Sequence, residues 1–282
     1  MSKIAIVTDS TCNLTKDQVE KYNLTVAPQV LIWGDKTYED GVDIQPKEFY
    51  ERLRTASVMP STSQATVATF EKIFKRLLAE EYEILAILIS DVLSGTINSA
   101  VLAREMFPNA PIEIVDSKSV SLALGFQVLT VARAAQGGEI MAECVQLAKK
   151  ASKHTGVVFA VDTLEFLHRG GRIGGGKRFL GTALKIKPIL ELREGRVEAL
   201  EQVRTRKKSL SRLVEILEER VAGKSPIRLA GLHADAYEDA KEILSLANER
   251  IQSVENILSE VSPVVGANAG PGTVGLAYMA GM

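Results

Sequence analysis

The chain has 282 residues, a formal net charge of -1 and 46% hydrophobic residues. This length fits two compact domains, and the composition is that of a globular protein with a core and not of a disordered chain. The balanced charge argues against nucleic acid and anionic lipid as partners, and two cysteines with three scattered histidines exclude a disulfide framework and a zinc-ligand spacing.

The N-terminal segment and the overall hydropathy bear on localisation. The first ten residues, "MSKIAIVTDS", contain one cation and a short apolar run, too little for a signal peptide. No stretch approaches the roughly 18 apolar residues of a membrane span. We therefore expect a cytoplasmic protein without a membrane segment.

Strands and helices alternate in the first half of the chain. The stretch 82–90, "YEILAILIS", is almost continuously apolar, which is typical of a strand buried on both faces of a parallel sheet. The alternation predicts a doubly wound, mainly parallel sheet. Strands are predicted over residues 3–10, 24–34, 82–90 and 111–117, and helices over residues 15–23, 44–56, 66–81, 96–107, 121–136 and 140–153.

The pattern changes near residue 154. Residues 185–205 are typical of two antiparallel strands joined at Glu194 and Gly195, so the second half should contain a mixed sheet. We predict an α/β protein of two domains, 1–154 and 155–282, with a ligand cleft between them. The other predictions are strands over 154–163, 226–234 and 261–269, helices over 208–222 and 236–251, and a short helix from about Thr273.

Two glycine-rich stretches approach nucleotide-binding fingerprints without meeting their requirements. Only seven residues follow "GPGTVG" (270–275), too few to complete a βαβ unit, so a tight turn into a helix N-terminus that suits an anion, or a plain turn, is predicted instead. In "GRIGGGKR" (171–178), Arg178 stands where a P-loop requires Ser or Thr, and the preceding residues are typical of a helix. We predict no nucleotide cofactor at either place.

Three polar clusters without cations lie at predicted strand or helix ends: "TDSTCN" (8–13), "STSQAT" (61–66) and "SDVLSGTINSA" (90–100). Ligands bind outside the carboxyl ends of strands in open α/β sheets, so the clusters predict a shared crevice for a carboxylate or a hydroxyl-rich molecule. One alternative is that Ser94 or Thr96 merely caps the following helix. A nucleophilic Ser94 is a weaker alternative, because the G-x-S-x-G elbow is missing.

Several motifs, in the same order along the whole chain, resemble the DegV family of bacterial fatty-acid-binding proteins. They are "TDSTCNL", "STSQAT", "SDVLSGTINSA", "VDS", "LEFLHRGGRIGG", "KPIL" and "GPGTVGLAY". The resemblance implies a two-domain α/β protein that encloses one long-chain fatty acid between its domains. It implies no catalytic residue, no metal and no cofactor in this chain.

The resemblance also implies particular ligand-binding residues. Ser94 of "SGT" and Thr62 of "TSQ" would hold the fatty-acid carboxylate. Family members commonly have a histidine two residues before "GPG", where this chain has Asn268, which can donate from its amide but carries no positive charge. Further residues expected beside the ligand are Ser63, Gly95, Arg172 and Gly270.

A partner protein is the last implication of the resemblance. Related members are the acyl-carrying subunit of a fatty-acid kinase, and present the carboxylate to a separate ATP-binding subunit. Arg204 in "QVRTRKK" would contact that partner, although a solvated charge run at a helix start is an equal alternative. Two other functions stay open at this point: an enzyme acting on a small polyol or keto compound in the same crevice, and a binding protein for another amphipathic lipid.

Overall fold

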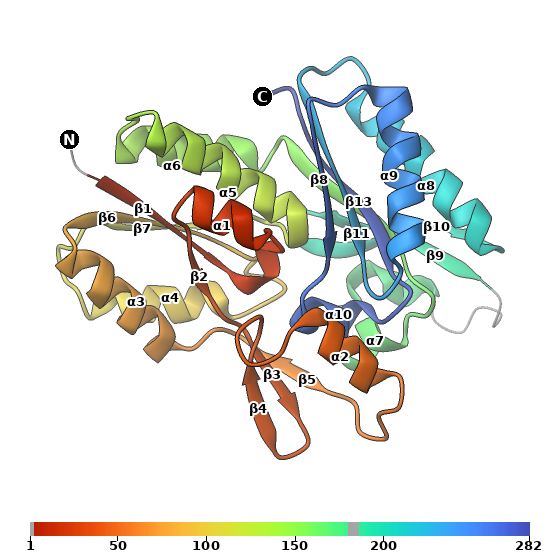
Figure 1. The fold of residues 1–282 in the computed structure, drawn as a ribbon, viewed down its shortest axis with the longest axis horizontal. Coiled ribbons are helices and arrows are strands. Elements are labelled where there is room, and N and C mark those ends of the chain that lie inside the picture. The colour runs from red at the N-terminus through yellow and green to blue at the C-terminus, as the bar shows by residue number, and fades with distance from the viewer. Residues whose placement is uncertain (1–2, 180–185) are drawn as a thin grey trace.

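A computed structural model describes residues 3–179 and 186–282. Its first sheet is parallel and has the strand order β2–β1–β6–β7 (Figure 1), as predicted for the first half of the chain. The strand β6 is buried along Ile84 to Leu88 because helices cover both faces of the sheet. The strands are β1 (Lys3–Asp9), β2 (Thr25–Ala27), β6 (Tyr82–Leu88) and β7 (Ile112–Asp116).

Helices pack on both faces of this parallel sheet. On one face, Phe70 and Phe74 contribute to a core between the strands and the helices α3 (Val67–Ala79) and α4 (Thr96–Glu105). The other face is covered by α5 (Ser121–Gln136) and α6 (Met141–Ala151), through residues such as Val128 and Val145. Two short helices, η1 (Ser10–Cys12) and α1 (Lys16–Lys21), follow β1, and Thr15 caps α1.

The second sheet is mixed and has the strand order β10–β9–β8–β13–β11–β12. Only β11 and β12 pair in parallel; the other neighbours are antiparallel. The helices α8 (Arg206–Val221) and α9 (Tyr237–Ile251) cover its outer face. The strands are β8 (Thr155–Ala160), β9 (Lys187–Arg193), β10 (Arg196–Val203), β11 (Ile227–His233), β12 (Glu255–Glu260) and β13 (Val274–Ala280). A mixed second sheet is thereby confirmed; residue 185, at the start of the predicted strand pair, lies outside the described residues.

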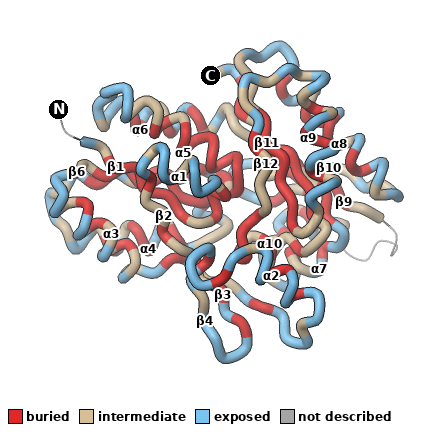
Figure 2. The backbone as a smooth tube through the Cα atoms, in the orientation of Figure 1, coloured by how far each residue is buried: buried red, intermediate tan, exposed pale blue. Residues whose placement is uncertain are grey.

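Helix α5 lies between the two sheets (Figure 1). One of its faces packs Leu124 and Val128 against the parallel sheet, and the opposite face packs Phe126 and Leu129 against the mixed sheet. Figure 2 shows that the buried backbone follows the strands of both sheets. The two sheets therefore share a helical layer, and the domain limits 1–154 and 155–282 stay a prediction.

A third, three-stranded sheet with the order β4–β3–β5 was not predicted. The predicted strand over 24–34 is interrupted at Pro28 and Gln29, so that its halves enter different sheets as β2 and β3 (Val30–Trp33). Strands β4 (Lys36–Glu39) and β5 (Ser61–Ser63) complete this sheet, and α2 (Pro46–Leu53) packs beside it. The polar cluster 61–66 thus begins with a strand.

Two predictions near the C-terminus are wrong. The predicted strand over 261–269 is the helix α10 (Pro263–Ala269), because Pro263 occupies its first turn, and the strand before it is β12. The predicted helix from about Thr273 is β13, a central strand of the mixed sheet. The glycines of "GPG" do form a turn, with φ of +83° at Gly270 and +78° at Gly272, but it leads into a strand and offers no helix N-terminus.

Candidate functional site

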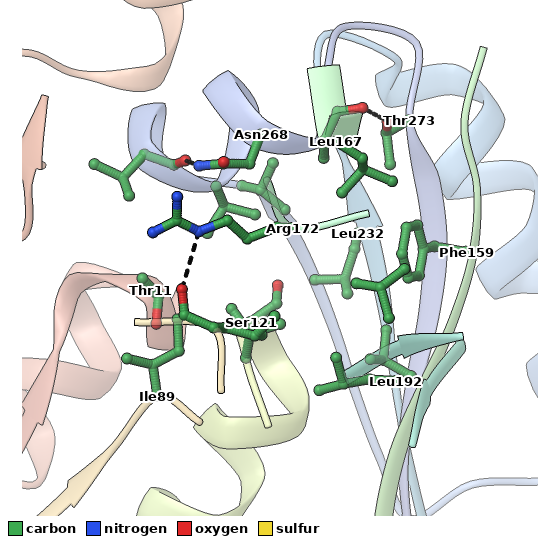
Figure 3. Close-up of a pocket in the computed structure, with 18 of the residues that line it drawn as sticks. Thr11, Ile89, Ser121, Phe159, Leu167, Arg172, Leu192, Leu232, Asn268 and Thr273 are labelled. Atoms are coloured by element: carbon green, nitrogen blue, oxygen red, sulfur yellow. Dashed lines mark hydrogen bonds between the residues drawn. The ribbon is translucent and has the colours of Figure 1, made fainter. Parts of the chain in front are cut away.

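A cavity lies between the parallel and the mixed sheet, and encloses about 950 Å³ of space between protein atoms, its mouth included. Its lining comes from both halves of the chain, as the predicted cleft requires. Figure 3 shows Phe159, Leu192 and Leu232 on one side of this space. We call these three residues the apolar wall.

The cavity lining also contains polar side chains, which we call the polar wall: Thr62, Ser63, Ser94, Arg172 and Asn268. Figure 3 shows Asn268 and the Arg172 guanidinium facing away from the apolar wall. Each predicted polar cluster supplies the cavity with at least one residue, since Thr11 also lines it. Residues predicted from separate motifs are therefore neighbours in the fold.

Ser94 is held by a buried hydrogen-bond network. Its Oγ lies 2.8 Å from Thr96 Oγ1, which accepts a hydrogen bond from Gln29 Nε2 at 2.8 Å. Helix α4 begins after Gly95 without any side-chain cap, so the capping alternative for Ser94 and Thr96 is wrong. Within the described part of the chain, the Ser94 hydroxyl forms no hydrogen bond with a histidine or carboxylate that could act as its base, which disfavours a nucleophilic role.

Thr62 is oriented by Asn268. The Asn268 amide nitrogen donates to Thr62 Oγ1 at 3.2 Å and to the Val264 carbonyl oxygen at 3.0 Å. Because Thr62 Oγ1 accepts this bond, its own proton is free to donate into the cavity. Asn268 acts on a ligand through Thr62 in this arrangement, whereas the sequence-based expectation was direct donation to the carboxylate.

Arg172 brings a positive charge to the polar wall. Its side chain is half-buried, with Nε donating to the Leu93 carbonyl oxygen at 3.0 Å and Nη1 to the Gly170 carbonyl oxygen at 2.6 Å. These bonds hold the guanidinium at Leu93, the residue before Ser94, and at Gly170, which packs against Asn268. A carboxylate at this wall would meet hydroxyl donors and one cation.

The remaining predicted residues lie outside the cavity lining. Gly95 is exposed and contacts Gln64, and Gly270 is buried against Phe166 at the end of α10. Arg204 is exposed on the turn between β10 and α8, and forms no hydrogen bond or ion pair with the described residues.

Two buried residues near the site, Gln29 and Asp40, were not predicted from the sequence. Gln29 is 1% exposed and lines the cavity. It could have been found in the sequence as the lone polar side chain within the apolar stretch "VAPQVLIW". Asp40 accepts hydrogen bonds from Ser10 Oγ at 2.6 Å and from the Val264 N–H of α10 at 3.2 Å. Burial raises the pKa of Asp40 to about 6, although these bonds oppose the effect.

Neither a metal centre nor a membrane span is found within residues 3–179 and 186–282. No group of three or more His, Cys, Asp or Glu side chains there could hold a metal ion. No helix there is long and apolar enough to cross a bilayer. The site combines the apolar wall with the hydrogen-bond donors of the polar wall, which suit one anionic group.

Comparisons with known proteins agree along the whole chain. The model of a family described as "Uncharacterised protein, DegV family" matches residues 3–281. A DegV domain-containing protein of Streptomyces coelicolor is 36% identical over 275 residues, 97% of either chain. Two solved structures are similar over 99% of this chain: a fatty-acid-binding DegV family protein of Thermus thermophilus (TM-score 0.93, 32% identity, 99% of that chain) and the fatty acid binding protein DegV of Bacillus subtilis (0.90, 31%, 100%).

Proposed function

Because this chain belongs to the DegV family, we propose that it binds one long-chain fatty acid in the cavity between its sheets. The acyl chain lies along the apolar wall, and the carboxylate accepts hydrogen bonds from Ser94 and Thr62 near Arg172. The observation that carries the proposal is that one cavity combines the apolar wall with the donors of the polar wall. The similar proteins of Thermus thermophilus and Bacillus subtilis are fatty-acid-binding proteins.

The energetics of such a ligand are favourable. A sixteen-carbon chain offers about fourteen methylenes, whose transfer from water contributes on the order of 11 kcal/mol at ~0.8 kcal/mol each. Association costs roughly 4 to 15 kcal/mol in lost freedom, so headgroup bonds and a preformed cavity must supply the surplus. A polyol or keto substrate would gain nothing from Phe159, Leu192 and Leu232, which disfavours the small-molecule enzyme.

The proposal includes a partner. We propose that the protein has no catalytic activity of its own. It presents the carboxylate of the bound fatty acid, in the cytoplasm, to a separate ATP-dependent kinase subunit. Arg204 supports this role, because an exposed arginine that pairs with none of the residues described by the structure is available to another protein. Arg204→Glu should slow phosphorylation of the bound fatty acid by a purified fatty-acid kinase subunit with ATP, whereas the exposed Lys207→Glu serves as control; equal rates would remove Arg204 from the contact.

Mass spectrometry of organic extracts from the natively purified protein tests the ligand. We expect near-stoichiometric fatty acid in the wild type, and an occupancy lowered about tenfold or more in Thr62→Ala/Ser94→Ala, which loses two bonds to a charged group. The control Thr37→Ala/Ser57→Ala removes two exposed hydroxyls outside the cavity and should keep full occupancy. An empty wild type that stays empty after incubation with a panel of fatty acids would refute the proposal.

A further inference from the structure

We propose that Gln29 and Thr96 are positioning residues that form a one-way hydrogen-bond chain, which turns the Ser94 hydroxyl into a donor for the ligand carboxylate. The inference rests on the proposed function, since it concerns the same headgroup. Neither Gln29 nor Thr96 needs to touch the carboxylate. They act by fixing the direction in which Ser94 donates.

The chain starts at a backbone group. The Ala65 N–H donates to Gln29 Oε1 at 3.1 Å, and a backbone N–H can only donate. This bond fixes which end of the Gln29 amide is oxygen, so the amide nitrogen faces Thr96 Oγ1 at 2.8 Å. Thr96 is therefore an acceptor from Gln29.

The single proton of Thr96 has two possible acceptors. Gln29 Oε1 lies 3.1 Å away and already accepts one bond from the Ala65 N–H, whereas Ser94 Oγ lies closer, at 2.8 Å. When a carboxylate accepts the Ser94 proton, Ser94 Oγ is left as an acceptor, and Thr96 can donate to it. All donors then point the same way: Ala65 to Gln29, Gln29 to Thr96, Thr96 to Ser94, and Ser94 to the ligand.

The burial of Gln29 and Thr96 makes the direction of their hydrogen bonds energetically important. Gln29 is 1% exposed and Thr96 is fully buried, so solvent does not compete for their hydrogen bonds. In such surroundings bonds in a chain strengthen one another, and a donor left without an acceptor is costly. Ser94 itself is only half-buried, which leaves its hydroxyl within reach of the cavity.

The first experiment compares Thr96→Val with Thr96→Ser. Valine keeps the shape of threonine and removes the hydroxyl, whereas serine keeps the hydroxyl and removes a methyl. We expect Thr96→Val to lower the affinity for palmitate about tenfold, as for loss of a bond to a charged group, and to leave the affinity for methyl palmitate within about twofold. Thr96→Ser should retain the wild-type preference for the acid.

A spectroscopic readout separates positioning from a structural effect. With palmitate labelled with carbon-13 at the carboxyl, the NMR shift against pH reports the pKa of the bound headgroup. Donors lower a carboxyl pKa, so Thr96→Val should raise the pKa of bound palmitate and Thr96→Ser should not. A merely structural residue would weaken acid and ester alike and leave this pKa unchanged, which would overturn the proposal.

A second variant covers the case in which Thr96→Val fails to fold. Gln29→Glu keeps the length of the side chain and an oxygen for the Ala65 N–H, but replaces the donor to Thr96 by an acceptor, so that Thr96 turns away from Ser94. The control Gln64→Glu adds the same charge on an exposed side chain beside Gly95, outside the chain of bonds. We expect Gln29→Glu to lower the acid-to-ester preference further than Gln64→Glu; equal losses would contradict the chain.

The outcomes distinguish the two proposals. If the wild type binds neither palmitate nor its ester, the proposed function fails. If the wild type binds palmitate, and the acid preference and headgroup pKa are the same in wild type, Thr96→Val and Gln29→Glu, only the positioning role fails.

Discussion

At the scale of residues, the two hydroxyl groups proposed to bind the carboxylate, those of Thr62 and Ser94, are each backed by an amide. Asn268 donates to Thr62, and Gln29 reaches Ser94 through Thr96. Each amide is also bound to the backbone, Gln29 through its oxygen and Asn268 through its nitrogen, which fixes its orientation, whereas a lone hydroxyl rotates. The wall can therefore offer donors in a set geometry while Arg172 alone supplies charge.

The position of Asn268 depends on a glycine. A Cβ added at Gly170 would collide with Asn268 Oδ1, so Gly170→Ala should push the Asn268 amide off Thr62. We expect fatty-acid occupancy to fall about fivefold to tenfold, as for loss of one oriented bond to a charged group, in a protein that still folds. Extraction and mass spectrometry measure this.

The matched control for Gly170→Ala is Gly156→Ala. There the new methyl group would meet the Tyr278 ring, outside the cavity lining. It should lower the thermal midpoint without lowering occupancy in the folded fraction. If Gly170→Ala retains as much fatty acid as Gly156→Ala, Asn268 does not orient the headgroup donors.

Residue types were predictable at this site, but their bonds were not. The polar clusters pointed to Thr62 and Ser94, and the family resemblance added Asn268 and the shared role of all three at the carboxylate. Nothing in the sequence shows that Asn268 donates to Thr62, or that Gln29 stands next to Thr96, since these pairs are separated by long stretches of chain. Hydrogen-bond direction is a property of the folded neighbourhood.

At the scale of elements, α10 links the polar wall to the parallel sheet. Its N-cap residue, Ser262, makes no side-chain cap, and Asp40 accepts from the Val264 N–H instead. Asp40 also accepts from Ser10, in η1 after β1. Since α10 carries Asn268, the Asp40 carboxylate helps to place the headgroup donors.

Replacing Asp40 by Asn should change how stability depends on pH. The folded pKa of about 6 exceeds the ordinary value of 3.8, so the folded state binds more protons than the unfolded state between about pH 4 and 6. The free energy of unfolding of the wild type should therefore fall as pH rises through this window, by about 2 to 3 kcal/mol relative to Asp40→Asn. Urea unfolding of both proteins from pH 4 to 7.5 measures the difference.

Asp35→Asn controls for the loss of one negative charge at an exposed position. Buried carboxyl groups that do not interact with Asp40 cancel in the comparison, and Asp9, whose charge raises the pKa of Asp40, is present in both proteins. If the free energies of unfolding of the wild type and of Asp40→Asn differ by a constant amount over the whole pH range, Asp40 does not have a raised pKa in the folded protein.

The sequence misassigned α10 and β13 for a physical reason. The stretch "VSPVVGANA" contains three β-branched residues, which favour a strand, but Pro263 presets the first turn of a helix. The stretch after "GPG" is almost continuously apolar, and a short apolar run is compatible with either a buried helix or a central strand. The partners that decide, β8 and β11 on either side of β13, are distant in the chain.

At the scale of the whole molecule, the cavity depends on the two sheets keeping their relative position. The shared helix α5 packs against both, and Arg133 on α5 pairs with Glu255 of β12 at 2.6 Å. A second link joins Arg54, just after α2, to Asp235 after β11 through two hydrogen bonds. A ligand held between the sheets adds to these links.

Removing the fatty acid should therefore lower the thermal stability of the whole protein. A ligand that binds only the folded state stabilises it by about 2.7 kcal/mol at a free concentration of 100 Kd, which corresponds to a shift on the order of 5 °C for a chain of this size. We expect delipidated protein to unfold at a lower midpoint, and added palmitate to raise the midpoint with concentration. In Thr62→Ala/Ser94→Ala the same palmitate concentration should raise it less, because the headgroup bonds are missing. Equal midpoints for stripped and reloaded wild type, with loading verified by extraction, would show that the fatty acid does not bridge the two sheets.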